Sequence, residues 1–371
     1  MNDAVRVAVT LEQCWHRVPG GTATSVLRLV DALRSDDSLD LVGVAARHAS
    51  PPPEPFVPSV PVRHATLPRV ALYESWHALR WPSVESVTGP VDVVHATAVA
   101  VPGCMAPLVV TIHDLAFLAD PSQATRHGNR FFRRGTELAR RHASRVMVPS
   151  EATAAECRSA GFDDARIRVV PWGVDVADPV DDAEAASVLS RLRLDRPFVL
   201  FVGTIEPRKN LAAVIAAAAG LDGSHVDLVI VGPDGWNEDL ESRLAPLDDT
   251  TVRVRRMGFV TESDLAVLYA TCAVFCYPSL REGFGLPVLE AMAHGAPVVT
   301  SSGTATEEVA GDAALLADPH DHEAVARAVR RLVTDDGCAT EMRTRSREQA
   351  ARFPWSRSAS LTAEVYREAV A

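Results

Sequence analysis

Short runs of apolar, largely β-branched residues alternate with helix-like segments along the whole chain. The first half has six such runs and the second half restarts the pattern with five; they cover residues 5–10, 41–45, 91–95, 108–113, 146–149, 167–170, 198–202, 226–231, 252–255, 274–277 and 296–300. Strands that alternate with helices of this length are typical of βαβ units and parallel sheets. Two sets of them predict an α/β protein with two Rossmann-like, doubly wound domains.

The overall charge limits the kind of partner this chain can have. Its formal net charge is −11, which argues against a dedicated nucleic-acid binder because such domains are strongly basic. The six cysteines are scattered without a C-x-x-C pair, which fits a reduced compartment. No signal-peptide pattern and no apolar run of membrane-spanning length is found. We expect a cytoplasmic protein whose anion-binding sites are local.

One lysine stands out among the basic residues. Of 37 Lys and Arg residues only Lys209 is a lysine, and it follows Arg208 in a polar loop after an apolar strand and a glycine turn. Such a loop suits a phosphate or diphosphate, with Arg as a planar fork and Lys as a point charge. A solvated basic pair is the alternative interpretation.

The segment 278–295 carries the strongest local signal, PSLREGFGLPVLEAMAHG. Its glycines allow close backbone approach to a ligand, and Pro287 suits the first turn of a helix whose free amides can bind an anion. Glu282 and Glu290 can accept hydrogen bonds from hydroxyl groups. Each glutamate can instead be explained as an acidic residue that complements the helix dipole.

These motifs resemble the retaining, nucleotide-sugar-dependent glycosyltransferases of family four, which have the GT-B architecture. The resemblance is specific in the second half and looser in the first. The matching motifs are PGGT (19–22), TIHD (111–114), VPS (148–150), VPWGVD (170–175), GTIEPRKNL (203–211), VGP (231–233), GFV (258–260), Glu282 with Glu290, GAPVV (295–299) and DP (318–319).

The resemblance implies three parts: an acceptor-binding domain over 1–175, a donor-binding domain over 176–353, and a helix over 354–371 that crosses back to the first domain. It implies that cations neutralise the donor diphosphate and that carboxylates contact the donor sugar and ribose. The implied catalytic residues are His113 and Glu282, and the implied donor-binding residues are Gly21, Arg208, Lys209, Phe259, Phe284, Gly285, Leu286 and Glu290.

The resemblance also implies transfer of a hexose with retention, in which the donor phosphate takes the acceptor proton. TIHDLAF (111–117) is similar to mannosyl-type members, so mannose from GDP-mannose is the first expectation, with UDP-sugars and dTDP-rhamnose left open. The acceptor is expected to be a glycan or a lipid-linked glycan in polysaccharide synthesis. No metal and no other cofactor is expected, because the cations of the loop are expected to neutralise the leaving diphosphate.

Segment 126–145 is the most basic of the chain, with seven arginines around Phe131 and Phe132. Basic and apolar groups together suit an anionic membrane surface or a lipid-phosphate acceptor. An arginine-covered surface helix accounts for the same pattern.

Other functions use the same kind of fold. A nucleotide-sugar epimerase would use the same donor site without an acceptor, and a non-catalytic nucleotide-sugar-binding partner of another transferase would lack the reaction centre. A dinucleotide-dependent oxidoreductase is disfavoured because the loop after the first strand has no G-x-G-x-x-G. A pyridoxal-phosphate enzyme would need Lys209 for its Schiff base.

Overall fold

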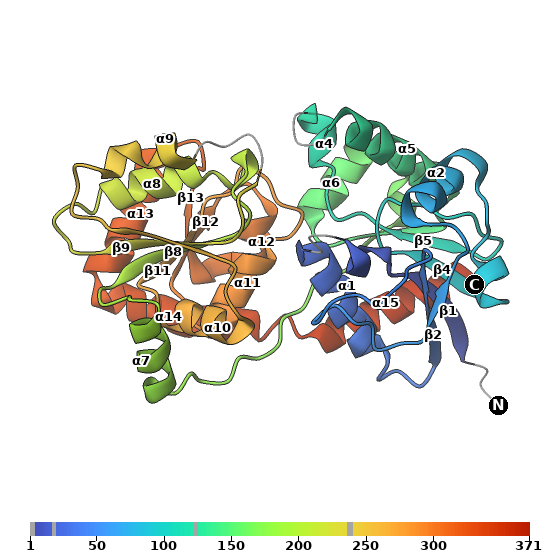
Figure 1. The fold of residues 1–371 in the computed structure, drawn as a ribbon, viewed down its shortest axis with the longest axis horizontal. Coiled ribbons are helices and arrows are strands. Elements are labelled where there is room, and N and C mark those ends of the chain that lie inside the picture. The colour runs from blue at the N-terminus through green and yellow to red at the C-terminus, as the bar shows by residue number, and fades with distance from the viewer. Residues whose placement is uncertain (1–3, 17–19, 122–124, 236–239) are drawn as a thin grey trace. The chain divides into compact units, whose positions relative to one another are not determined.

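A computed structural model describes residues 4–16, 20–121, 125–235 and 240–371. The chain divides into two compact units, Met1–Gly173 with Trp355–Ala371, and Val174–Pro354. Each unit is a parallel sheet with helices on both faces (Figure 1). The prediction of two doubly wound α/β domains is confirmed.

The first unit, hereafter the N-unit, contains a seven-stranded parallel sheet in its described residues, in the order β3-β2-β1-β4-β5-β6-β7. The strands are β1 (Val5–Thr10), β2 (Leu39–Ala45), β3 (Val62–His64), β4 (Val93–Ala96), β5 (Leu108–Thr111), β6 (Arg145–Val148) and β7 (Ile167–Val169). The helices are η1 (Glu12–Trp15), α1 (Gly20–Leu33), α2 (Arg69–Leu79), α3 (Glu85–Thr88), α4 (Ala116–Ala119), α5 (Arg126–His142), α6 (Glu151–Ser159), η3 (Asp164–Arg166) and α15 (Trp355–Val370).

The second unit, hereafter the C-unit, has a six-stranded sheet in its described residues, in the order β10-β9-β8-β11-β12-β13. The strands are β8 (Phe198–Val202), β9 (Asp227–Val231), β10 (Val254–Gly258), β11 (Val274–Tyr277), β12 (Val298–Ser301) and β13 (Ala314–Ala317). The helices are α7 (Asp182–Arg191), η4 (Pro207–Lys209), α8 (Leu211–Ala219), α9 (Leu240–Leu244), η5 (Ala245–Leu247), α10 (Glu262–Thr271), α11 (Leu286–Ala293), α12 (Ala305–Ala310), η6 (Gly311–Ala313), α13 (His322–Thr334) and α14 (Asp336–Ala350).

The central strands are buried over most or all of their length, which explains why they read as continuous apolar runs. Five of them, β4, β5, β9, β11 and β12, contain only buried residues. Parallel strands have this composition because helices cover both faces of the sheet. The edge strands β3 and β13 are partly exposed, and neither was among the strands expected from the sequence.

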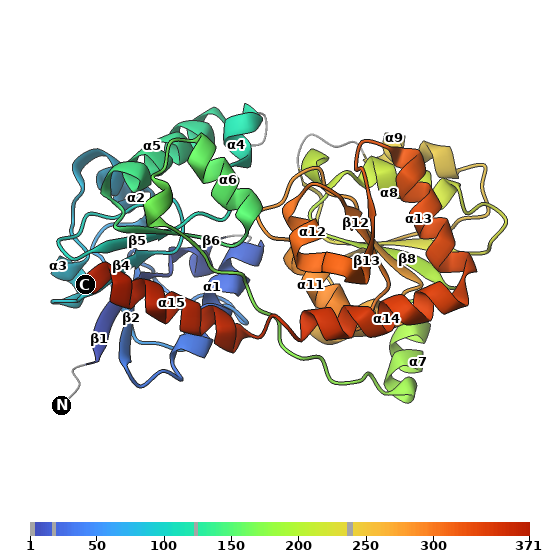
Figure 2. The ribbon, with the colours of Figure 1, turned by 180° about the vertical axis from the view of Figure 1, so that it is seen from behind.

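The C-terminal helix α15 belongs to the N-unit, where it packs against α1 (Figure 2). Tyr366 of this helix is fully buried, and its hydroxyl lies 2.7 Å from Nδ1 of His95 on β4. Glu368 forms ion pairs with Arg145 and Arg168 on β6 and β7. The last turns of the chain are therefore part of the N-unit's fold. Among the described residues no helix is both long and apolar enough to cross a membrane.

Candidate functional site

The strand order of the C-unit identifies the place where its ligand site is expected. Strand β8 comes first in sequence and lies between β9 on one side and β11 on the other, so the chain winds away from it in both directions. Loops that follow the two strands at such a switch point leave a crevice at the carboxyl edge of the sheet, where open α/β folds bind ligands. Arg208 and Lys209 follow β8, and Glu282 follows β11.

One asparagine ties these two loops together. Asn210, directly after η4, has a left-handed backbone with φ of 55°, and its side-chain amide donates to the carbonyls of Pro278 at 3.0 Å and Pro319 at 2.7 Å. The backbone of Leu280 also donates to the carbonyl of Arg208 at 2.8 Å. The loop after β8 is thereby fixed against the loop after β11. This role of Asn210 is visible only in the structure.

Glu282 lies at the centre of a buried polar cluster. Its side chain is 8% exposed, and Oε1 accepts from Nζ of Lys209 at 2.6 Å, while Oε2 accepts from Nη1 of Arg208 at 3.1 Å. Oε1 also accepts from the hydroxyls of Tyr277 at 3.0 Å and Ser279 at 2.7 Å. The structure thus brings together three of the predicted site residues and adds two hydroxyl groups that the sequence did not indicate.

The electrostatics of this cluster keep Glu282 ionised. Burial raises the pKa of its carboxyl, but the charges of Lys209 and Arg208 outweigh that effect and lower the pKa to about 2. Burial lowers the pKa of Lys209, and the carboxylate of Glu282 counteracts part of this decrease. Glu206 is also buried and pairs with Arg208 at 2.6 Å. Two carboxylates therefore hold the two cations in place.

The N-terminus of α11 supplies backbone donors beside this cluster. Gly285 caps the helix with φ of 104°, and a Cβ there would come within 2.7 Å of Cγ2 of Thr306, so a side chain is excluded. The amides of Phe284, Gly285 and Leu286 have no backbone acceptor assigned among the described residues. Phe284 is buried and packs edge-on against Phe353. These amides and the helix dipole favour an anion or a sugar hydroxyl.

The two remaining C-unit candidates differ in their surroundings. Glu290 is half-buried on α11, and Oε2 accepts from the hydroxyl of Tyr269 at 3.3 Å. Phe259 follows β10 and is 75% exposed, so its ring is available to a ligand. Tyr269 is a further neighbour that sequence reasoning did not select.

In the N-unit, His113 follows β5 at the carboxyl edge of the sheet. Its Nε2–H donates to the carbonyl of Thr97 at 2.8 Å, and its ring lies 5.6 Å from that of Trp172. Burial lowers the pKa of His113, so the imidazole is neutral near pH 7. Thr97 is itself fixed by Thr10 and Gln13 from the neighbouring strand β1 and its loop. Gly21 lies exposed in the first turn of α1.

The basic segment forms α5, capped by the side chain of Thr125. Arg140 and Arg141 pair with Glu137, and Arg134 donates to the carbonyl of His77. Three arginines have neither a hydrogen bond nor an ion pair among the described residues, and their spacing of four and three residues places them on one exposed face: Arg126, Arg130 and Arg133.

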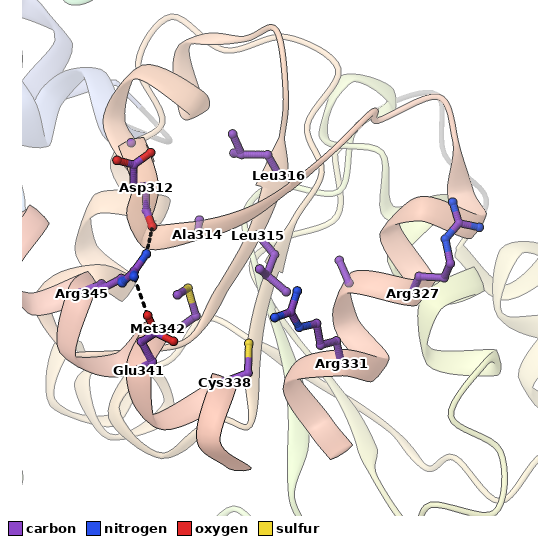
Figure 3. A pocket seen from close by; sticks show the side chains of 12 residues that line it. Asp312, Ala314, Leu315, Leu316, Arg327, Arg331, Cys338, Glu341, Met342 and Arg345 are labelled. Atoms are coloured by element: carbon purple, nitrogen blue, oxygen red, sulfur yellow. Dashed lines mark hydrogen bonds and ion pairs between the residues drawn. The ribbon is translucent and has the colours of Figure 1, made fainter. Parts of the chain in front are cut away.

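A pocket of about 700 Å³ lies elsewhere in the C-unit, at the open edge formed by β13, α13 and α14 (Figure 3). Leu315, Leu316 and Met342 contribute its apolar wall, and Arg345 pairs with Glu341 at its rim. Its lining includes none of the predicted site residues. It is two strands away from the loop after β11, and we do not assign the donor site to it.

Comparison with known proteins identifies the family of this chain. The family model "Glycosyl transferases group 1" matches residues 183–353, and the model "Glycosyltransferase Family 4" matches residues 19–178. O-antigen chain mannosyltransferase B of Escherichia coli is 31% identical over 266 residues, which are 70% of each chain. Serotype-specific mannosyltransferase WbdA of Escherichia coli is 35% identical over 187 residues, and this match spans only 23% of that longer protein.

A solved structure shows the same fold. The crystal structure of Anabaena HepE in complex with UDP and glucose superposes with a TM-score of 0.73 over 97% of this chain and 98% of that chain, at 19% identity. The N-unit and the C-unit correspond to the two family models in turn. The chain therefore belongs to glycosyltransferase family 4 and is a glycosyltransferase of the GT-B fold.

Proposed function

We propose that this glycosyltransferase transfers a hexose from a nucleoside diphosphate sugar to a glycan or lipid-linked acceptor, with retention of the anomeric configuration. Mannose from GDP-mannose is our first candidate donor, since two relatives named mannosyltransferases match 70% and 48% of this chain. The single observation that carries the proposal is the pair of cations, Arg208 and Lys209, held by Glu282 at the β8/β11 switch point.

The chemistry of the transfer explains why such a pair is useful. The bond between the anomeric carbon and the diphosphate oxygen breaks, and the acceptor hydroxyl oxygen bonds to that carbon from the same face. The proton of the hydroxyl goes to the leaving diphosphate, so charge and atoms balance. Negative charge grows on the diphosphate, and fixed cations and helix amides stabilise such charge by several kcal/mol. Arg208 and Lys209 have this role in our proposal.

The carboxylates and the histidine have the complementary role. We assign Glu282 to the donor sugar, where its anion also opposes the positive charge that develops on the ring, and Glu290 to the ribose hydroxyls. His113, neutral near pH 7, is assigned to the sugar at the reaction centre. We further propose that transfer needs no metal ion, because positive charge for the diphosphate is already provided by two side chains.

A binding and transfer experiment tests these assignments. Calorimetry with GDP, UDP, dTDP and ADP, with and without EDTA, identifies the base and any metal requirement. Transfer from the matching nucleotide sugar, followed by NMR of the product's anomeric proton, reports configuration. We expect GDP to bind most tightly with EDTA present, and a retained configuration. Preferred binding of UDP moves the donor to a UDP-sugar, an inverted product refutes the retaining mechanism, and an epimerised sugar without transfer refutes the transferase proposal for this substrate.

Replacement of the single lysine gives a sharper test. Lys209→Ala removes a charge-assisted contact, so nucleoside diphosphate binding should weaken by about 1.5 to 3 kcal/mol. The matched control is Arg331→Ala, which removes an exposed cation from the pocket at β13 in the same unit. Calorimetry should show unchanged affinity for the control. Equal affinity of the Lys209 variant and the wild type would remove Lys209 from the donor site.

We also propose that α5 contacts an anionic lipid surface or the phosphate of a lipid-linked acceptor. Its support is the exposed row of Arg126, Arg130 and Arg133, none of which is neutralised by a neighbour among the described residues. Each basic residue near an anionic membrane contributes about 1 kcal/mol of attraction. Such a contact would bring a soluble donor and a membrane-held acceptor to the same enzyme.

A further inference from the structure

Three rings meet in the N-unit at the carboxyl ends of three neighbouring strands. Trp15 ends η1 after β1, His48 follows β2, and His64 ends β3. The Trp15 and His48 rings are stacked, with centroids 4.7 Å apart and an interplanar angle of 9°, and His64 stands edge-on to Trp15 at 5.6 Å. We call these three rings the ring shelf.

Polar contacts hold each ring of the shelf in a fixed orientation. Glu12 is 1% exposed, and its carboxylate accepts from Nε2 of His48 at 3.0 Å and from the amide of Ala46 at 2.7 Å. The indole N–H of Trp15 donates to the carbonyl of Ser50 at 2.9 Å. Nδ1 of His64 donates to the carbonyl of Ala46 at 2.7 Å. A buried carboxylate is costly to place unless it is paired, so this arrangement indicates rings that are held ready for a ligand.

The ring shelf lines a pocket of about 370 Å³ together with the proline-rich segment after β2. Val57 is 43% exposed in this pocket, and the prolines make its wall stiff. Nδ1 of His48 and Nε2 of His64 have no hydrogen-bond partner among the described residues. The lining residues are Trp15, His48, Ala49, Ser50, Pro51, Pro52, Val57, Pro58, Val62 and His64.

The chemistry of this lining selects an uncharged, hydroxyl-bearing ring. It includes no Lys or Arg, and the carboxylate of Glu12 is occupied by His48, so a phosphate or an acidic peptide would find no counter-charge. Aromatic faces and proline edges suit the apolar C–H face of a sugar, and the two open imidazole nitrogens suit its hydroxyls. A saccharide meets both requirements at once.

The position of the shelf sets the length of that saccharide. The strand order β3-β2-β1-β4-β5 places His48, after β2, three inter-strand spacings from His113, after β5. Neighbouring strands lie about 4.8 Å apart, so the two ends are separated by about 14 Å. A single hexose ring does not span that distance. We propose that the ring shelf is a distal acceptor subsite and that the acceptor is an oligosaccharide of several sugars; this rests on the proposed function, in which His113 serves the reaction centre.

Acceptor length is the variable that tests the proposal. Transfer rates are measured with acceptors of one to six sugars for the wild type, Trp15→Ala, Trp15→Phe and the exposed-site control Met105→Ala, which alters a side chain that is 84% exposed. In the wild type, KM should fall with acceptor length. Trp15→Ala should raise KM for the longest acceptor about ten-fold, the size expected for loss of one aromatic contact. Trp15→Phe should keep most of the affinity, and Met105→Ala all of it.

Several outcomes would overturn the subsite. A wild-type KM that is independent of length refutes it, as does a Trp15→Ala variant in which KM rises equally for one sugar and for six. If Trp15→Ala does not fold, as judged by circular dichroism, the exposed His64→Ala takes its place with the same expectation. Absence of transfer to every acceptor would instead contradict the proposed function. In that case the binding of the free hexasaccharide still tests the subsite. It is measured by saturation-transfer NMR in the wild type and in Trp15→Phe or His64→Ala.

Discussion

At the scale of single residues, Glu282 has a structural role that the sequence did not indicate, because it pairs with both Arg208 and Lys209. It pairs with two cations in a largely buried site, so Glu282→Gln leaves Lys209 without its carboxylate and leaves Arg208 paired with Glu206 alone. Breaking a buried ion pair in this way costs about 3 to 5 kcal/mol, and the free energy of unfolding should fall accordingly in urea denaturation. A nucleoside diphosphate supplies the missing negative charge, so it should raise the melting temperature of the variant more than that of the wild type.

The control for this prediction is Glu341→Gln, which breaks the exposed pair with Arg345 and should cost less than about 1 kcal/mol. Equal stability of Glu282→Gln and wild type would show that the cluster around Glu282 is not held by charge. The sugar-transfer rate should fall in either case, because the carboxylate assigned to the donor sugar is lost.

Site residues with unusual chemistry could be chosen from the sequence. The neighbouring residues that hold them in place could not. Lys209 and Glu282 stand out by rarity and by motif, and the structure brings them within 2.6 Å. Asn210, Tyr277 and Ser279 are ordinary residues in loops and strands, and their contacts depend on how two loops fold against each other. The two loops are far apart in the sequence and become neighbours only because β8 and β11 are adjacent in the sheet. Sequence spacing alone cannot predict such contacts.

At the scale of elements, central strands were predictable because burial on both faces makes them continuously apolar. Strands β3 (VRH) and β13 (ALLA) are short and partly exposed edge strands that were not predicted, whereas runs at the edge strands β7 and β10 were. The three rings of the ring shelf lie at or after the ends of β1, β2 and β3 and meet only when these strands pair. No motif in the sequence therefore indicated a site there. The amphipathic helix α5, by contrast, was evident from its arginines, although its partner was not.

The proposed membrane contact of α5 leads to a prediction for this element. Replacing Arg126, Arg130 and Arg133 together by Gln should remove about 3 kcal/mol of attraction to anionic vesicles. In flotation with phosphatidylglycerol vesicles the wild type should rise with the lipid and the triple variant should not. A variant with Arg140 and Arg141 replaced, which are already paired with Glu137, should float nearly as well as the wild type. Wild-type protein that stays at the bottom of the gradient refutes the contact.

At the scale of the whole molecule, the two units should differ in their response to acid. Burial lowers the pKa of several N-unit histidines, to about 4 for His77 and about 3 for His95, and it also lowers that of His113. In the C-unit, His294 is the one histidine of the described residues with a lowered pKa. A folded-state pKa below the ordinary 6.5 means that the unfolded chain binds more protons as the pH falls. Stability is therefore full above about pH 6.5 and declines toward pH 4.

Each buried histidine of this kind contributes a slope of about 1.4 kcal/mol per pH unit within that window, so the N-unit should lose stability faster than the C-unit. Tryptophan fluorescence reports mainly on the N-unit, because five of the six tryptophans lie in Met1–Gly173 and Trp355–Ala371. Between pH 7 and pH 5 the urea midpoint seen by fluorescence should fall further than the midpoint seen by circular dichroism, which follows both units. His95→Asn should reduce that difference, since it removes the most deeply buried titrating ring, whose partner Tyr366 holds α15. Midpoints that fall together, with or without His95, would mean that the units unfold as one and that the buried histidines do not set the acid response.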